Sequence, residues 1–139
     1  IGDGAKRNEL LKLKKSKRLE NILFLPWQEP SVLPYSLASG DIAVVALETE
    51  AVHASVPSKT YNYMAVGAPI LGIGPPGSAL DSLIHEYKMG GYFEGNNPSE
   101  ITSFIENLYH GQQVRFMYSN NSKNAGMLFN YKLSKEYLF

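Results

Sequence analysis

Val56-Pro57-Ser58-Lys59-Thr60-Tyr61-Asn62-Tyr63-Met64-Ala65-Val66-Gly67-Ala68-Pro69-Ile70-Leu71 is the stretch that decides the expected fold. Pro57 suits a place at or just before the first residue of a helix, where its missing N–H removes no hydrogen bond. Ser58 is a favourable N-cap. Gly67 is expected to end this short helix and Pro69 to open a buried strand. The stretch therefore predicts a helix-to-strand unit of an α/β protein.

The start of this helix also predicts an anion site. The first amides of a helix have no intrahelical acceptor, and they carry about half a positive charge toward a bound phosphate. Lys59 adds an ammonium group, and helical spacing places Ser58 and Asn62 on one face. The residues expected to bind a ligand that carries a phosphate group are Pro57, Ser58, Lys59, Thr60 and Asn62.

The run Pro-Ser-Lys-x-Tyr-x-Tyr-Met-Ala-x-Gly-x-Pro resembles the donor-binding segment of bacterial family 4 retaining glycosyltransferases, which have two Rossmann-like domains (the GT-B type). Two flanking runs resemble the same family. They are Ile1-Gly2-Asp3-Gly4-Ala5-Lys6-Arg7 through Leu23-Phe24-Leu25-Pro26, and Leu33 through Val44. The resemblance covers positions 1 to 109 in order, and an ordered set is more specific than any one motif.

The resemblance implies an α/β, Rossmann-like parallel sheet flanked by helices, the C-terminal and donor-binding domain of such an enzyme. Residues 1–139 would form one nucleotide-sugar-binding domain, in which Ile1 ends a strand whose earlier part is absent, so that the chain is a fragment truncated at its N-terminal side. Helices in 112–139 would cross to a missing acceptor domain. The implied activity is retaining transfer from a UDP- or GDP-sugar to a polysaccharide, lipid-linked or other glycan acceptor, without a cofactor, and the fragment alone is expected to be inactive.

Composition sets broader limits. The chain has 139 residues, 44% of them apolar, and no cysteine, so a core is available while disulfides and thiolate metal sites are excluded. The formal net charge is zero, but Lys and Arg gather in the first twenty residues. A solvated outer helix is one interpretation of this basic segment, and attraction to an anionic leaflet is the other. The expected location is cytoplasmic, with peripheral association at the inner face of the membrane as a further option.

Apolar runs and turn residues predict the order of elements. Buried strands are expected at Ile22–Leu25, Ile42–Leu47, Ile70–Ile73 and Gly90–Phe93. Helices are expected at 5–19, at 33–38 and at 79–88, the last with Ser78 as N-cap. A further helix is expected after Asn97, with a buried stripe of Ile101, Phe104, Ile105 and Leu108. The last two are expected at 112–119 and 123–137, separated by a break at 120–122.

Loops beyond the carboxyl ends of the strands are where ligands bind in such sheets. Trp27 and Gln28 follow the first strand and are candidates for the nucleobase wall, although Trp27 could equally cover the sheet edge. Many members of the family carry two glutamates separated by seven residues, but the matching positions here are Ala54 and Asn62. Glu48, Glu50 or His53 would have to replace the first glutamate, and these three are the catalytic candidates.

Other classes are disfavoured. The three histidines have no metal-ligand spacing, so no metal is expected, and no dinucleotide fingerprint is present. Aromatic and basic residues do not alternate, which argues against nucleic acid. Two alternatives stay open: a sugar-nucleotide epimerase of the same architecture, and a non-catalytic α/β interaction domain with a degenerate donor site.

Overall fold

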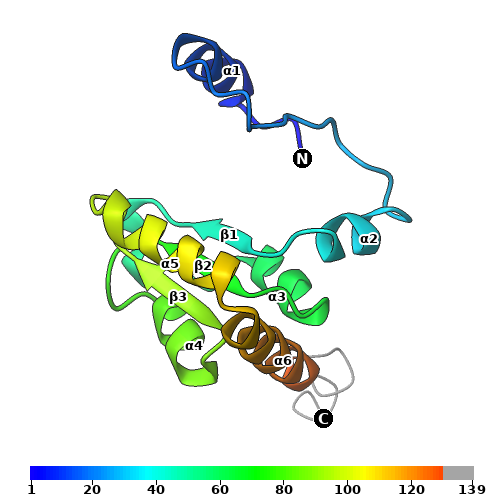
Figure 1. Ribbon diagram of the computed structural model, residues 1–139, viewed down its shortest axis with the longest axis vertical. Helices are drawn as coiled ribbons and strands as arrows, with labels where there is room; N and C mark the ends of the chain where they lie inside the picture. Colours follow the sequence, from blue (N-terminus) through cyan, green and yellow to red (C-terminus); the bar gives the residue numbers. More distant parts are fainter. Residues whose placement is uncertain (130–139) are drawn as a thin grey trace. The chain divides into compact units, whose positions relative to one another are not determined.

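The computed structural model describes residues 1–129 and divides the chain into two compact units, residues 1–35 and residues from 36 onward (Figure 1). The first unit holds helix α1 (Arg7–Ser16) and a segment without regular structure, and α2 (Leu33–Ala38) spans the boundary. All strands of the described chain belong to the second unit. The two units are described separately below.

Three parallel strands form the sheet of the second unit: β1 (Ala43–Ala46), β2 (Ile70–Ile73) and β3 (Gly90–Phe93), in the order β1-β2-β3. In the register, Ala43 lies opposite Ile70, and Ile70 lies opposite Gly90. Helix α3 (Ser58–Ala65) joins β1 to β2, and α4 (Ala79–Tyr87) joins β2 to β3. This confirms the expected α/β, Rossmann-like parallel sheet flanked by helices.

Successive residues of β3 pack against different helices. On one face of the sheet, Tyr92 lies beside Gly72 of β2 and beside Ile84 of α4. Phe93 packs against Phe104 of α5 (Pro98–His110) on the other face, with ring centroids 5.3 Å apart and the rings tilted. Helices therefore lie on both faces of β3, and α5 is drawn across the sheet in Figure 1. The largest fully buried apolar side chains are Val45, Met64, Ile70, Leu80, Ile84, Met89 and Leu108.

Helix α6 (Gln112–Leu128) replaces the two helices expected from the sequence. The break predicted at Asn120-Asn121-Ser122 is wrong, because the side chains of Asn121 and Ser122 make tertiary hydrogen bonds. Ser122 Oγ donates to the carbonyl of Ala68 at 2.8 Å, and Asn121 Nδ2 donates to the carbonyl of Lys88 at 2.8 Å. The part of the second predicted helix at 130–137 lies outside the described residues.

The strand predicted at Ile22–Leu25 is also wrong. The segment has no strand structure, and Leu23 and Leu25 are 78% and 45% exposed. A parallel strand needs hydrogen-bonded neighbours in a sheet. Within the described residues, one backbone hydrogen bond joins this segment to a distant part of the chain, and Gly2 N donates it to Leu25 O. Its apolar composition was therefore not sufficient to define a strand.

Three smaller expectations also need correction. Pro57, not Ser58, is the N-cap of α3, and Ser58 is the first helical residue. Val44 of β1 is 50% exposed, so that strand is buried on one face only. Ile105 is 41% exposed and does not belong to the buried stripe of α5. By contrast, Ser78 caps α4 as predicted, accepting a bond from Asp81 N at 3.1 Å.

Two buried hydroxyl groups in this fold allow a direct test. Ser122→Ala removes the donor to the buried Ala68 carbonyl and should lower the free energy of unfolding by about 1–3 kcal/mol. Thr60 is also fully buried, but its Oγ1 has no partner within the described residues. Thr60→Val should therefore leave stability unchanged or raise it. Urea unfolding measures both, and a Ser122→Ala variant as stable as the parent would contradict the assignment.

Candidate functional site at the carboxyl edge of the sheet

Three loops meet at the carboxyl edge of the sheet, one after each strand. They line a cavity of about 400 Å³. Its walls include Leu47 and Thr49 after β1, Gly74 after β2, and Glu94 and Asn96 after β3. This is the edge at which doubly wound α/β proteins bind ligands. The cavity therefore marks the first candidate region of the site.

The first turn of α3 is open at the same edge of the sheet. Ser58 and Lys59 are exposed, and the Ser58 side chain makes no capping hydrogen bond. The amide of Thr60 donates to the carbonyl of Pro57 at 2.9 Å. Helix geometry leaves the amides of Ser58 and Lys59 without an intrahelical acceptor. These two amides and the Lys59 side chain can therefore reach an anion in solvent.

The other residues predicted on α3 point in different directions. Thr60 is fully buried, because Thr60 and Met64 share the inward face of the helix. Its side chain is thus directed into the protein. Asn62 is exposed, one turn beyond Ser58. The structure therefore brings Ser58, Lys59 and Asn62 to the surface of α3, whereas Thr60 contributes packing.

The catalytic candidates lie in the loop between β1 and α3. This loop forms a short 3₁₀ helix, η1 (Thr49–His53). Glu48, Glu50 and His53 are all exposed, and their positions between β1 and α3 place them at the carboxyl edge. Their chemical roles stay predictions.

Trp27 and Gln28 belong to the first unit. Trp27 is 78% exposed, and Gln28 Nε2 donates to the carbonyl of Pro26 at 2.9 Å. Their role as a nucleobase wall likewise stays a prediction.

The start of α4 differs from the start of α3, although both lie at the carboxyl edge. Asp81 Oδ2 accepts a hydrogen bond from Gly77 N at 2.8 Å, and Ser78 Oγ accepts one from Asp81 N. His85 lies 2.7 Å from the Asp81 carboxylate. The Ser78 and Asp81 side chains thus occupy the amides of Asp81 and Gly77 at the start of α4. A negative carboxylate at this position also disfavours a phosphate.

Tyr92 is a residue at this edge that sequence reasoning did not single out. Its hydroxyl donates to the carbonyl of Pro75 at 2.9 Å and lies 2.9 Å from Ser78 Oγ. Its ring occupies space left free by Gly72 and Gly74, since a Cβ at either position would come within 2.6 Å of a Tyr92 side-chain atom. Tyr92 therefore holds the Gly-Pro-Pro-Gly turn that borders the cavity. Gly72 in β2 and Gly74 directly after it were the available signal.

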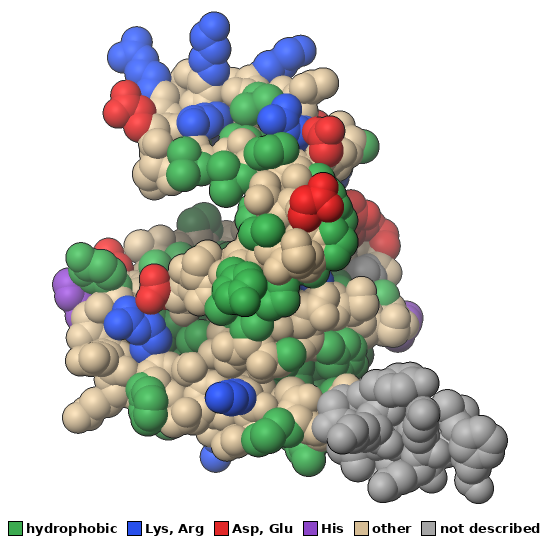
Figure 2. Space-filling model, turned by 90° about the vertical axis from the view of Figure 1, so that its right-hand side faces the viewer, with side chains coloured by type: hydrophobic (Ala, Val, Ile, Leu, Met, Phe, Trp, Pro, Cys, Tyr) green, Lys and Arg blue, Asp and Glu red, His purple; other side chains and the backbone are tan. Residues whose placement is uncertain are grey.

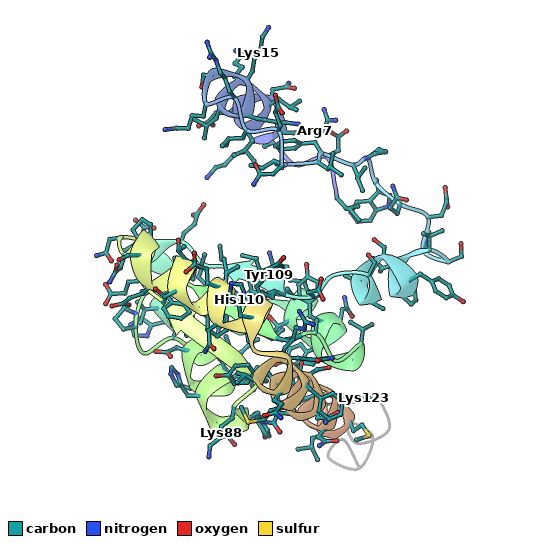
Figure 3. The ribbon with its side chains drawn as sticks, in the orientation of Figure 1. Arg7, Lys15, Lys88, Tyr109, His110 and Lys123 are labelled. Carbon is teal, nitrogen blue, oxygen red and sulfur yellow. The ribbon has the colours of Figure 1, made fainter. Side chains whose placement is uncertain are left out.

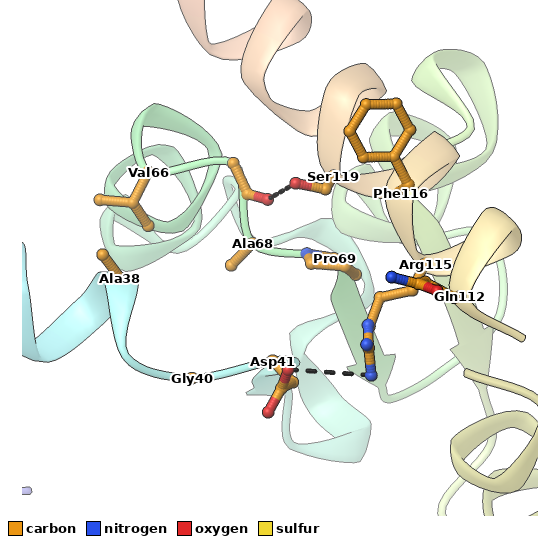
Figure 4. A pocket seen from close by; sticks show the side chains of 11 residues that line it. Ala38, Gly40, Asp41, Val66, Ala68, Pro69, Gln112, Arg115, Phe116 and Ser119 are labelled. Atoms are coloured by element: carbon orange, nitrogen blue, oxygen red, sulfur yellow. Dashed lines mark hydrogen bonds and ion pairs between the residues drawn. The ribbon is translucent and has the colours of Figure 1, made fainter. Parts of the chain in front are cut away.

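A second cavity, of about 310 Å³, lies near the amino ends of β1 and β2 (Figure 4). Arg115 reaches toward Asp41, with 3.8 Å between the charged atoms, and Ser119 Oγ donates to the carbonyl of Gly67 at 2.7 Å. This edge is opposite the one where such folds bind ligands. We interpret the cavity as a packing feature of the junction between α6 and the sheet.

Metal binding and membrane spanning were not indicated by the sequence, and the described residues give two observations on them. Across residues 1–129, no three His, Asp or Glu side chains come together in a way that could hold a metal ion. Across the same residues, every helix is too short or too polar to cross a membrane.

Fold and site together define a Rossmann-like α/β domain with one open, cationic helix start at the carboxyl edge of its sheet. The chain is 30% identical over 111 residues to the probable glycosyltransferase WbjE of Pseudomonas aeruginosa, a match covering 78% of the chain and 27% of that protein. It is 36% identical over 67 residues to the putative colanic acid biosynthesis glycosyl transferase WcaI of Escherichia coli K12, covering 48% of the chain and 16% of that protein. No family model and no solved structure matches.

Both relatives carry the name glycosyltransferase, which supports a glycosyltransferase family for this chain. The chain spans well under a third of either relative.

The hydroxyl of Tyr92 gives the second prediction. Tyr92→Phe should lower the free energy of unfolding at pH 7 by about 1–2 kcal/mol, because the buried carbonyl of Pro75 loses its donor. Tyr118→Phe is the matched control, since within the described residues that hydroxyl has no hydrogen-bond partner. Equal effects of the two changes would remove Tyr92 from this role.

The same residue predicts a pH effect. Burial raises the pKa of Tyr92 above its ordinary value, Ser78 lowers it in part by hydrogen bonding, and Asp81 raises it. The folded state thus favours the neutral phenol. This stability is complete below the unfolded pKa of about 10 and is lost as pH rises through the higher folded pKa. Above pH 10 the stability difference between the parent and Tyr92→Phe should therefore shrink.

Proposed function

We propose that the carboxyl edge of the sheet binds the diphosphate of a nucleotide-diphosphate sugar, through the Ser58 and Lys59 amides and the Lys59 ammonium group. The observation that carries this proposal is a contrast among three helices. Helices α3, α4 and α5 all begin at this edge; α4 has Asp81 and α5 has Glu100 in its first turn, whereas α3 has no acidic residue there. An anion is therefore favoured at α3 and disfavoured at its two neighbours.

The proposed reaction is retaining transfer of a glycosyl group from a UDP- or GDP-sugar to a polysaccharide, lipid-linked or other glycan acceptor. As the bond between the sugar and the diphosphate breaks, negative charge increases on the departing phosphate oxygen. Amides and an ammonium group fixed in place stabilise that charge more in the transition state than in the ground state. The similarity to two proteins named glycosyltransferases supports this reaction type.

The remaining predicted residues take secondary parts in this proposal. Asn62 is exposed beside the first turn of α3 and could hydrogen-bond a ribose hydroxyl, as donor or acceptor. Glu48, Glu50 or His53 would contact the sugar. Acceptor binding would come from parts of the protein outside this chain, so the chain alone should bind donor weakly and give no measurable turnover.

Lys59→Ala tests the proposal. Loss of a charge-assisted hydrogen bond, worth about 1.5–3 kcal/mol, should weaken UDP or GDP binding roughly tenfold to hundredfold. Lys59→Arg should retain most of the affinity, because it keeps a positive charge. Titration calorimetry or a thermal-shift titration with each nucleotide gives the dissociation constants.

Lys123→Ala is the matched control. Lys123 is an exposed lysine of α6 close to Gly67, on the side of the amino ends of the strands (Figure 3). Its removal should leave nucleotide affinity unchanged. Binding of neither nucleotide by the parent chain, or equal affinity in the parent and Lys59→Ala, would refute the diphosphate site.

A further inference from the structure

The charges of the first unit are concentrated on one helix and its immediate ends. Between positions 6 and 18 the chain has seven cationic residues and one acidic residue, Glu9. The whole chain nevertheless has a formal net charge of zero. Any attraction of this helix to an anion must therefore come from local charge. Figure 2 shows these Lys and Arg side chains projecting from α1 at the top of the view.

Most of these cations are not neutralised by neighbours. Arg7 pairs with Asp3, with 3.4 Å between the charged atoms. The others that we group as the basic surface of α1 have no ion pair within the described residues: Lys12, Lys14, Lys15, Lys17 and Arg18. All but Lys14 are exposed. Helix α1 also buries none of its residues, so the basic surface is accessible in the described chain.

Two leucines lie beside this surface. Leu10 and Leu13 are each 45% exposed and share a helix face with Lys17. Long lysine side chains beside half-exposed leucines are typical of helices that lie in a membrane interface, where leucines enter the acyl boundary and ammonium groups reach the phosphates. A soluble polyanion would give the leucines no such environment.

We infer that the basic surface of α1 binds the surface of an anionic lipid bilayer. Charge complementarity supplies the attraction, and each lysine near such a surface strengthens binding about fivefold. Nucleic acid is the less suitable anion, since residues 1–21 contain no aromatic side chain on which a base could stack. This inference uses residues that the proposed diphosphate site does not, and it can fail or succeed independently.

Cosedimentation with vesicles tests the inference on the full chain. Vesicles of phosphatidylcholine with 30% phosphatidylglycerol should bind the protein, and vesicles of phosphatidylcholine alone should not. Binding should fall steeply as sodium chloride is raised from about 0.01 to 1 M, since the screening length shortens from about 30 to 3 Å. Substituting Lys12→Glu together with Lys15→Glu should weaken binding at least about 25-fold.

Lys88→Glu together with Lys123→Glu is the matched control, because each pair changes the net charge by the same amount. Lys88 and Lys123 are exposed residues of the second unit, and Lys15 lies on α1 (Figure 3). The control pair should retain binding, with far-UV circular dichroism showing that all variants are folded. Equal losses in both pairs, binding to neutral vesicles, or no binding by the parent would overturn the inference. So would a stronger preference for single-stranded DNA than for the anionic vesicles.

Discussion

Contact between α6 and the segment from α3 to β2 is the constraint on which the sheet unit depends. Ser119 and Ser122 donate to the carbonyls of Gly67 and Ala68, where the chain turns from α3 into β2. At Gly126 a side chain could not fit, because a Cβ would lie 2.8 Å from the backbone of Met64. Hydroxyl donors and a missing side chain together let two backbones approach closely while their polar groups stay paired.

This contact also explains which parts of the fold a sequence could predict. Elements determined by local chemistry were predicted: Ser78 caps α4, and Pro98 follows the N-cap of α5. The errors arose where a distant segment decides the outcome. Asn121 and Ser122 resemble helix breakers, but their acceptors lie more than thirty residues away in sequence. Tertiary hydrogen bonds therefore reversed a local preference.

Candidate residues of the site divide in the same way. The exposed start of α3 was predicted from Pro57 and Lys59. The predicted N-cap, Ser58, is one residue away from the true N-cap, Pro57, because proline and serine both suit helix starts. The two glycines alone did not identify Tyr92, since the spaces at Gly72 in β2 and at Gly74 directly after it lie on a neighbouring segment. A pairing register between strands has to be known before such a contact can be recognised.

Electrostatics at the carboxyl edge favours one helix start over another. Helices α3 and α4 follow adjacent strands, so their amides face the same edge of the sheet and would compete for an anion. Asp81 already accepts the amide of Gly77, and its negative charge opposes a phosphate there. At α3 the nearest charged side chain in the first turn is Lys59, with no carboxylate in that turn. A diphosphate at this edge would therefore bind at α3, and the capped start of α4 would keep the adjacent turn rigid.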